Sequence, residues 1–539
     1  MRTARHQAMV VAPQPEAAEA GTEILQAGGN AVDAAIATAF VQGVVDPLMC
    51  GIAGFGSMAV FRAADRTHEY VDFHAPAPAA ATPDMWADLI EGEARDGFGF
   101  TLRGNVNDIG YQSICVPASL RAYAVAHQRH GRLPWAELLA PAIDWARKGW
   151  QVRPHVHEFW SAPSEMGRVA NHERISRDAS ARALYCRADG SPKLVGDEVR
   201  NPDLAATLDA IARGGADVFY TGEIAAAIAA DMQAHDGLIS AADLAGYAPK
   251  ITAPLSTRYR GFEVTSNPPP GGGLMLIEML NILENFDLAA MGHNSPDYVR
   301  TVAEAMKHAT IDKDGRIGDP EFIEVPVEKL MSKAYARELA DRIRAGEKAD
   351  VPRFSPEAPC KDTTHLSVID AEGNCVSMTH SLGMPSGVIT AGLGFQYNGC
   401  MGVFDPRPGR AGSIAPGKAR FSSICPSIIF RDGAPYVVIG APGATQIAMG
   451  VLQAVLNILD FGASMSEAVA LPRFSATSNA IDVTNRIPRR VTRVLEAEGY
   501  PVIRSAKSFG VAWVHGIRVT GDGLEGGADP GADGVALAC

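Results

Sequence analysis

A proline-rich polar linker, KADVPRFSPEAPCKD at residues 348–362, divides the chain into two parts with different patterns. Before the linker, helical patterns predominate, above all in residues 115–250. After it come short alternating strands with tight turns. A chain of 539 residues is too long for one ordinary core, so we expect two large units or one broad layered domain. The junction of the linker with the strand that begins at Thr363 therefore becomes the point to explain.

Composition excludes several classes of function. The net charge of −13, without a dense basic run, argues against a nucleic-acid partner. No stretch is apolar for long enough to span a membrane, and the first residues contain no secretory signal pattern. The eight cysteines are scattered without a CxxC or zinc-like spacing. We therefore expect a cytoplasmic protein with reduced cysteines and no membrane partner.

The segment before the linker contains clear helix signals. PEAAEAGTEILQAGGNAVDAAIATAFVQGVV predicts two helices, with Gly28 and Gly29 ending the first and Asn30 capping the second. Further along, RYRGFEVTSNPPPGGGLMLIEMLNILENF predicts a strand, a Pro-Gly turn and an amphipathic helix.

Two β-hairpins are predicted after the linker. In the first, TTHLSVID and CVSMTHS flank the turn AEGN. A two-residue turn centre at Glu372-Gly373 pairs Thr363 with Leu382, which places Ser381 beside Thr363. In the second, PSIIF and PYVVIG flank RDGA and lead into APGATQ, a sharp turn that opens an apolar helix. Such a turn points free backbone N–H groups at whatever lies nearby.

Thr363 is a candidate nucleophile. If the Asp362–Thr363 bond is cut, Thr363 gains a free α-amine with an unperturbed pKa of roughly 7.7–8.0. The amine can then act as the base for the hydroxyl of the same residue. That hydroxyl can also attack the carbonyl of Asp362 first, which would make the cleavage self-catalysed. A Thr-Thr pair by itself indicates only the start of a strand, so the wider pattern decides.

Several long stretches, in this order along the chain, together resemble the γ-glutamyltransferase (glutathione hydrolase) family: ILQAGGNAVDAAIA, LPWAELLAPAIDWARKGW, NPDLAATLDAIARGGADVFYTGEIA, YRGFEVTSNPPPGGGLMLIEMLNILENFDL, DTTHLSVIDAEGNCVS, FSSICPSIIF and VIGAPGATQ. The resemblance implies an α/β N-terminal-nucleophile hydrolase fold of four layers (αββα), two sheets stacked between helices. It also implies a precursor that cuts itself into a largely helical large subunit, residues 1–362, and a small subunit, residues 363–539.

Matching positions imply the catalytic roles. Thr363 would be nucleophile and base, and Ser381 stands where the family has a threonine that holds the nucleophile's hydroxyl. Gly443 and Ala444 match the glycine pair whose backbone N–H groups form the oxyanion hole. Alanine at the second place keeps the N–H, which is the group that stabilises the oxyanion.

The positions that would bind the donor's carboxylate match the family pattern only in part. Ser422 and Ser423 match the serine pair that binds the donor's carboxylate. The arginine that also grips this carboxylate in the family is His74 here, which exchanges a permanent cation for a group that is mostly neutral at pH 7.

The residues that hold the donor's α-amine in the family also differ. The family's Asn is Gly383 here, and an alignment without gaps replaces its Gln by Cys400 and its acid by Val403. An ammonium without an acidic partner would be a desolvated charge, so a γ-glutamyl donor should bind poorly. A shifted alignment would place an acid such as Asp405 there and restore glutamyl specificity.

The expected substrate is therefore an amide of a small acyl group that carries a carboxylate or a small polar end, such as a glutaryl amide or oxamate. Water is the expected acceptor and an amine the alternative. No metal or organic cofactor is required, and His365 is predicted to pack or orient because the threonine supplies its own base. A true γ-glutamyltransferase and an inactive binding or scaffold protein remain the alternatives, and the sequence leaves open whether the processed pair forms a homodimer.

Overall fold

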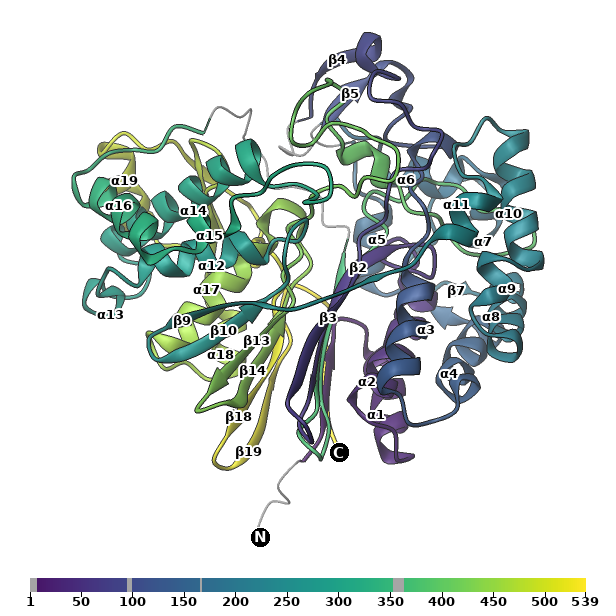
Figure 1. Ribbon diagram of the computed structural model, residues 1–539, viewed down its shortest axis with the longest axis horizontal. Helices are drawn as coiled ribbons and strands as arrows, with labels where there is room; N and C mark the ends of the chain where they lie inside the picture. Colours follow the sequence, from purple (N-terminus) through teal and green to yellow (C-terminus); the bar gives the residue numbers. More distant parts are fainter. Residues whose placement is uncertain (1–6, 95–98, 165–166, 352–362) are drawn as a thin grey trace.

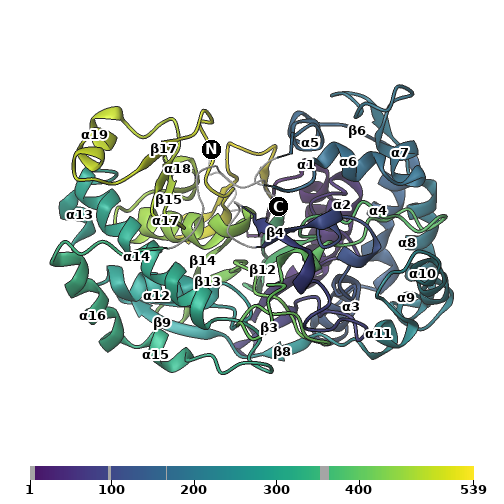
Figure 2. The same ribbon diagram turned by 90° about the horizontal axis from the view of Figure 1, so that it is seen from above.

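The computed structural model describes residues 7–94, 99–164, 167–351 and 363–539. Two β-sheets lie face to face in the centre, and helices cover the outer face of each (Figure 1). Seen from above, the two helical layers lie on opposite sides of the paired sheets (Figure 2). The expected four-layer αββα fold is confirmed.

The first sheet has seven strands, which follow one another across it in this order: β20 (Val535–Ala538), β1 (Met9–Ala12), β11 (Thr364–Ile369), β12 (Cys375–Ser381), β2 (Phe55–Arg62), β3 (Thr67–Phe73) and β8 (Lys250–Thr252). The second has six strands, in the order β19 (Gly523–Gly527), β18 (His515–Thr520), β14 (Ala434–Gly440), β13 (Ser427–Arg431), β10 (Phe262–Ser266) and β9 (Leu255–Tyr259). Neighbouring strands in both sheets are antiparallel.

The helices on the side of the first sheet are α1 (Pro15–Gln26), α2 (Ala31–Val45), α3 (Ser119–His130), α4 (Trp135–Lys148), α5 (Pro154–Trp160), α6 (Asn171–Ser176), α7 (Ala179–Tyr185), α8 (Pro202–Gly214), α9 (Asp217–Tyr220), α10 (Glu223–Ala234) and α11 (Ala241–Gly246). Those on the side of the second sheet are α12 (Gly273–Leu283), α13 (Leu288–Met291), α14 (Pro296–Arg316), α15 (Val327–Met331), α16 (Lys333–Arg344), α17 (Ile447–Leu459), α18 (Met465–Ala470) and α19 (Arg489–Ala497). Helix α2 packs on β11 and β12, and α12 and α17 pack on the second sheet.

Three smaller sheets lie outside these layers: β4 (Ile90–Glu93) with β5 (Phe100–Leu102), β6 (Trp150–Gln151) with β7 (Glu198–Val199), and β15 (Phe474–Ser475) with β16 (Ile481–Val483) and β17 (Val502–Arg504). No helix in the described ranges is both long and apolar enough to cross a bilayer.

The two helices predicted near the N-terminus are confirmed. Asn30 caps α2 by accepting hydrogen bonds from the backbone N–H groups of Val32 and Asp33. The Asp33 side chain in turn accepts one from the backbone N–H of Asn30, which completes a capping box. Helix α2 is buried almost all round, and it supports the strands that follow the linker.

The predicted register of the first hairpin is wrong by one residue. Strands β11 and β12 pair Ile369 with Cys375 and Thr364 with His380, so Thr363 lies opposite Ser381 rather than Leu382. The loop contains three residues instead of two, because Gly373 adopts a φ of 85° and its N–H donates to the carbonyl of Asp370. This is the three-residue hairpin with a left-handed glycine.

Both large sheets combine strands from the two sides of the linker. In the first, β1 pairs with β11 and β20, and β12 pairs with β2. In the second, β10 pairs with β13. The sheets also contact each other through the Ser377 hydroxyl on β12, which donates to the carbonyl of Ile439 on β14 at 2.9 Å. A cut at the linker would therefore leave every strand of both sheets paired.

This interlocking predicts that residues 1–362 and 363–539 stay together after cleavage of the Asp362–Thr363 bond. The cut protein should elute from a size-exclusion column as one species, because backbone ladders and the core between the sheets join the pieces. Denaturing electrophoresis of the same fraction should show both pieces. Elution of either piece by itself under native conditions would contradict the prediction.

Candidate active site

Thr363 lies immediately before the first residue of β11, in the interior of the first sheet. Its side chain is buried, with 6% of the residue exposed, and its hydroxyl donates to the Ser381 hydroxyl at 3.2 Å. Ser381 Oγ also accepts a hydrogen bond from the backbone N–H of Gly383 at 2.8 Å. The hairpin thus brings the predicted nucleophile and its predicted partner into direct contact. Asp362, the other side of the predicted cleavage point, lies outside the described residues.

The residue after the candidate nucleophile is held by a buried amide network. Thr364 Oγ1 lies 3.2 Å from Gln14 Nε2 and 3.1 Å from Gln42 Nε2. Gln42 is in turn bonded to His380 on β12 at 2.8 Å. Burial lowers the pKa of His380 to about 3, so the ring is a neutral member of this network. Side chains from α2, β12 and the segment before α1 therefore fix the start of β11.

His365 points to the other face of β11, toward the second sheet. Its ring nitrogens lie 2.8 Å from Thr379 Oγ1 and 3.0 Å from Ser367 Oγ. Any side-chain carbon at Gly440 would lie 2.3 Å from this ring, so glycine is required for the close packing of β14 on β11. Burial lowers the pKa of His365 well below its usual value. The ring is therefore neutral and packs between the sheets, as predicted.

The turn after β14, which carries the predicted oxyanion-hole residues, has a strained backbone. Gly443 has a φ of 143° and Ala444 a φ of 50°, which is unusual for a residue with a side chain. Ala512 packs against Gly443, since a Cβ at that glycine would lie 2.7 Å from the Ala512 Cα. The N–H of Trp513 donates to the carbonyl of Pro442 and pins the same turn. The packing of Gly440 on His365 brings this turn to the end of the sheet where Thr363 lies.

The predicted serine pair is held by the Pro-Gly turn before α12. Ser422 and Ser423 are both buried. The backbone N–H of Ser422 donates to the carbonyl of Pro270 at 2.9 Å. A Cβ at Gly272 would lie 2.4 Å from the Ser423 carbonyl oxygen, so this glycine allows the two segments to touch. The PPPGGG stretch thus packs directly against residues 422–423.

Two of the positions that differ from the γ-glutamyl pattern meet at one place. Cys400 begins a short 3₁₀ turn, Cys400–Val403, and Gly383 follows β12. A methyl group added to Gly383 would lie 3.4 Å from Cys400 Sγ and 3.3 Å from Nη2 of Arg420. The guanidinium of Arg420 thus fills the space beside Gly383. The sequence pattern did not single out Arg420, although a cation two residues before the serine pair was a usable signal.

The remaining candidate positions, Val403 and Asp405, lie at the end of this 3₁₀ turn and just after it. Val403 ends the same 3₁₀ turn and is half-buried. The Asp405 carboxylate binds the guanidinium of Arg407 at 2.9 and 2.7 Å. It is therefore engaged in a local ion pair.

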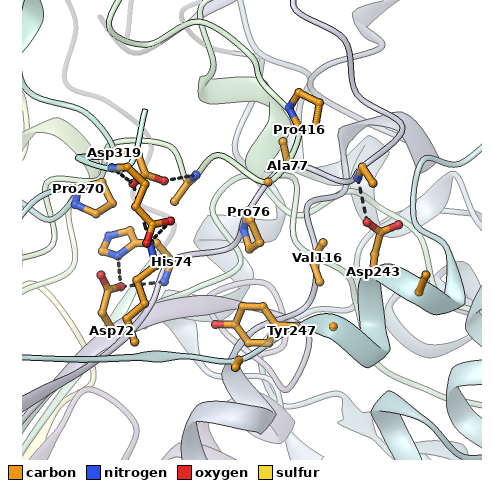
Figure 3. Close-up of a pocket in the computed structure, with 18 residues that line it drawn as sticks. Asp72, His74, Pro76, Ala77, Val116, Asp243, Tyr247, Pro270, Asp319 and Pro416 are labelled. Carbon is orange, nitrogen blue, oxygen red and sulfur yellow. Dashed lines mark hydrogen bonds and ion pairs between the residues drawn. The ribbon is translucent and has the colours of Figure 1, made fainter. Parts of the chain in front are cut away.

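His74 is one of the residues that line a pocket of about 510 Å³, and its ring lies beside Asp72 there (Figure 3). Its Nδ1 lies 2.5 Å from the Asp72 carboxylate, and its buried Nε2 has no hydrogen-bond partner. Phe55 is next to both His74 and Arg420: its ring centre lies 6.1 Å from that of His74 and 4.2 Å from the guanidinium carbon of Arg420. Among the described residues no group of three or more His, Cys, Asp or Glu side chains is arranged to hold a metal ion.

The model of the gamma-glutamyltranspeptidase family matches residues 17–539. The chain belongs to the gamma-glutamyltranspeptidase family. Its sequence is 37% identical over 536 residues to the acylase ACY 1 proenzyme of Pseudomonas sp. (strain V22), covering 98% of this chain and 93% of that protein. It is 33% identical over 545 residues to the glutathione hydrolase proenzyme of Escherichia coli (strain K12), covering 97% of this chain and 90% of that protein.

The fold comparison agrees with this assignment. The crystal structure of a cephalosporin acylase from Bacillus halodurans matches with a TM-score of 0.88 and 29% identity over 99% of this chain and 96% of that one. These relatives of the gamma-glutamyltranspeptidase family are named acylases and glutathione hydrolases, so this family member is an enzyme. The names do not agree on one substrate, which leaves the acyl group to be argued from this chain's own residues.

The buried network predicts a pH effect on stability through Asp46, whose carboxylate accepts from Gln14 Nε2 at 2.9 Å. Burial raises its pKa to about 6. The folded protein thus holds an extra proton between about pH 4 and pH 6, so this contribution to stability is present below pH 4 and lost as the pH rises through 6. In D46N the group cannot ionise, and the loss of up to about 3 kcal/mol should disappear.

Denaturant unfolding of wild type and D46N at several pH values between 4 and 7 measures this. The stability of D46N should rise relative to wild type as the pH increases. The exposed control D522N should follow the wild-type curve. Parallel curves for wild type and D46N would show that Asp46 does not titrate in this range.

Proposed function

We propose that this enzyme is a self-processing N-terminal-threonine amidohydrolase that acts on an amide of a small, carboxylate-bearing acyl group. Thr363 is the proposed nucleophile and base, released by cleavage after Asp362. The observation that carries the proposal is the position of Thr363. This residue immediately precedes an interior strand, and its hydroxyl lies 3.2 Å from Ser381 Oγ. The relatives named as proenzymes support a processed precursor.

In the proposed reaction the Thr363 α-amine takes the proton of the hydroxyl while Oγ1 attacks the amide carbon. The Ser381 hydroxyl orients Oγ1, and the N–H groups of Gly443 and Ala444 stabilise the oxyanion. Collapse of the tetrahedral intermediate breaks the C–N bond, and the leaving amine takes the proton from the α-ammonium. Water then attacks the acyl ester, which releases the acid and restores the hydroxyl. An amine in place of water would give transfer.

The acyl group is proposed to carry a carboxylate and no α-amine, as in a glutaryl amide. The support is the absence of an acid at Gly383, Cys400 and Val403, together with the acylase names of two relatives. A γ-glutamyl substrate is the second candidate, favoured by the name of the E. coli relative. A purely binding role has no support from the site, where the residue types for catalysis are in place. We also propose a cytoplasmic location, supported by seven unpaired cysteines in the described ranges.

The mass of the purified protein tests the nucleophile. Wild type should appear as two pieces, the second beginning Thr-Thr-His-Leu, and T363A should remain one chain without amidase activity. The conservative variant T363S keeps a hydroxyl and should still be cut. T363A protein that is cut at the same bond, or that retains wild-type turnover, would exclude Thr363 as the nucleophile.

Two anilides that differ only in the α-amine test the acyl group. The processed enzyme should turn over glutaryl p-nitroanilide with a higher kcat/KM than γ-glutamyl p-nitroanilide, because an ammonium would find no acid at its end of the site. The release of nitroaniline measures both. A clear preference for the γ-glutamyl compound would identify a true γ-glutamyl enzyme instead.

The free α-amine also sets a pH dependence. Activity should rise with an apparent pKa of about 7.7–8.0 if the Thr363 amine keeps its ordinary pKa and must be neutral to act as a base. The pH profile of kcat/KM with an uncharged acyl anilide measures it, since that substrate does not titrate. A profile that is flat from pH 6 to 9 would argue against the amine as the base.

A further inference from the structure

Arg420 is a buried cation beside Gly383, which follows the strand that carries Ser381. Only 6% of the residue is exposed. Nη1 donates to the carbonyl of Phe421 at 3.1 Å, and Nη2 lies 3.8 Å from Cys400 Sγ. The guanidinium carbon lies 4.2 Å from the centre of the Phe55 ring. Nε is also buried and has no hydrogen-bond partner.

Within the part of the chain that the structure describes, three other arginines are as deeply buried, and each forms an ion pair with an aspartate: Arg168 and Arg174 with Asp108, and Arg473 with Asp529. Arg420 differs from them because no carboxylate of the described residues pairs with it. Burying a charge without a counter-charge is unfavourable. A group of this kind inside an enzyme's site indicates that a ligand supplies the missing charge.

The neighbouring thiols do not supply this charge. Burial raises the pKa of Cys400 even though the adjacent Arg420 acts in the opposite direction. Burial also raises the pKa of Cys115, which lies close enough to interact electrostatically with Arg420. Both sulfurs are therefore neutral thiols at pH 7. The surroundings of the guanidinium are two thiols, a phenyl ring and one backbone carbonyl.

A short series of contacts joins Arg420 to Thr363. The Thr363 and Ser381 hydroxyls lie 3.2 Å apart, and Ser381 Oγ lies 2.8 Å from the Gly383 nitrogen. Gly383 has a φ of 64°, and a methyl group there would lie 3.3 Å from Arg420 Nη2. A side chain at 383 would therefore sit tightly against the guanidinium, and the left-handed backbone there also favours glycine.

We propose that Arg420 is the specificity-determining residue that binds the distal carboxylate of the acyl group, through the edge formed by Nε and Nη2. This inference rests on the proposed function and names the substrate class of that site, monoamides of small dicarboxylic acids. An arginine edge matches a carboxylate with two parallel hydrogen bonds. The same charge repels an ammonium, so Arg420 discriminates against γ-glutamyl groups as well as recognising acids.

Gly383, Cys400 and Arg420 then together form the proposed carboxylate-binding end of the site. The small residue at 383 and the short thiol at 400 leave room for the guanidinium, which replaces an ammonium-binding end by an anion-binding one. Arg420 stands two residues before Ser422, so one chain segment supplies the cation and the serine pair. His74, turned toward Asp72, is not needed as the cation.

The test compares processed wild type, R420Q and R420K on two five-carbon anilides, glutaryl p-nitroanilide and the uncharged valeryl p-nitroanilide. R420Q should lose about 10- to 150-fold in kcat/KM on the glutaryl compound, the range for hydrogen bonds to a charged group. Its kcat/KM on the valeryl compound should fall far less or rise, because that acyl group has no charge to pair with Arg420. R420K should lie between wild type and R420Q on the glutaryl compound. The exposed control R431Q should match wild type on both.

Two results would overturn the assignment. One is equal activity of wild type and R420Q on the glutaryl anilide. The other is an equal loss on both anilides, which would indicate a structural role. Self-cleavage at Thr363, followed by mass, shows whether each variant folds, because that step needs no external acyl group.

Calorimetric binding of glutarate separates this inference from the proposed function. If wild type hydrolyses no amide, the proposed function fails, but tighter binding of glutarate to wild type than to R420Q would still support an anion site at Arg420. Equal binding of glutarate to both proteins would overturn the anion site whether or not the protein is an amidase.

Discussion

The pairing of β11 between β1 and β12 is the constraint on which the rest of the site depends. It places the first strand after the linker inside a sheet whose other strands come from both ends of the chain. Thr363 is thereby held at the end of a rigid strand, and its hydroxyl meets Ser381 across the hairpin. A site built on paired strands keeps its geometry better than one built on loops.

The same pairing explains how a cut at residue 362 is compatible with a stable enzyme. The ladders that cross the linker, β1 with β11, β2 with β12 and β10 with β13, do not depend on the peptide bond before Thr363. The buried amide network around Thr364 also joins residues from both sides, through Gln14 and Gln42. Cleavage would add charged termini at the site without removing the contacts that hold it.

In the proposed function, the residues that bind the far end of the acyl group are distinct from the backbone elements that hold the catalytic residues. The backbone elements that hold the nucleophile, the serine pair and the strained turn at Ala444 need no alteration when the distal end changes. Gly383 has no side chain and Cys400 a short one, and the guanidinium of Arg420, from a third segment, lies beside both. In the proposed reaction, the sign of the charge that the site prefers would therefore be set by residues that do not take part in the bond-making step.

The four layers were expected only from the resemblance to a known family, whereas local pattern by itself determined the helices on either side of Asn30, both hairpins, and Thr363 with Ser381 beside it. These features depend on periodicity, capping and turn chemistry, which lie in contiguous residues. The hairpin register was missed because one left-handed glycine, Gly373, lengthens the loop by a residue. Only the tertiary structure decided that Arg420 is buried without a counter-charge and that His74 faces Asp72, since charge pairing depends on which distant segments fold against one another.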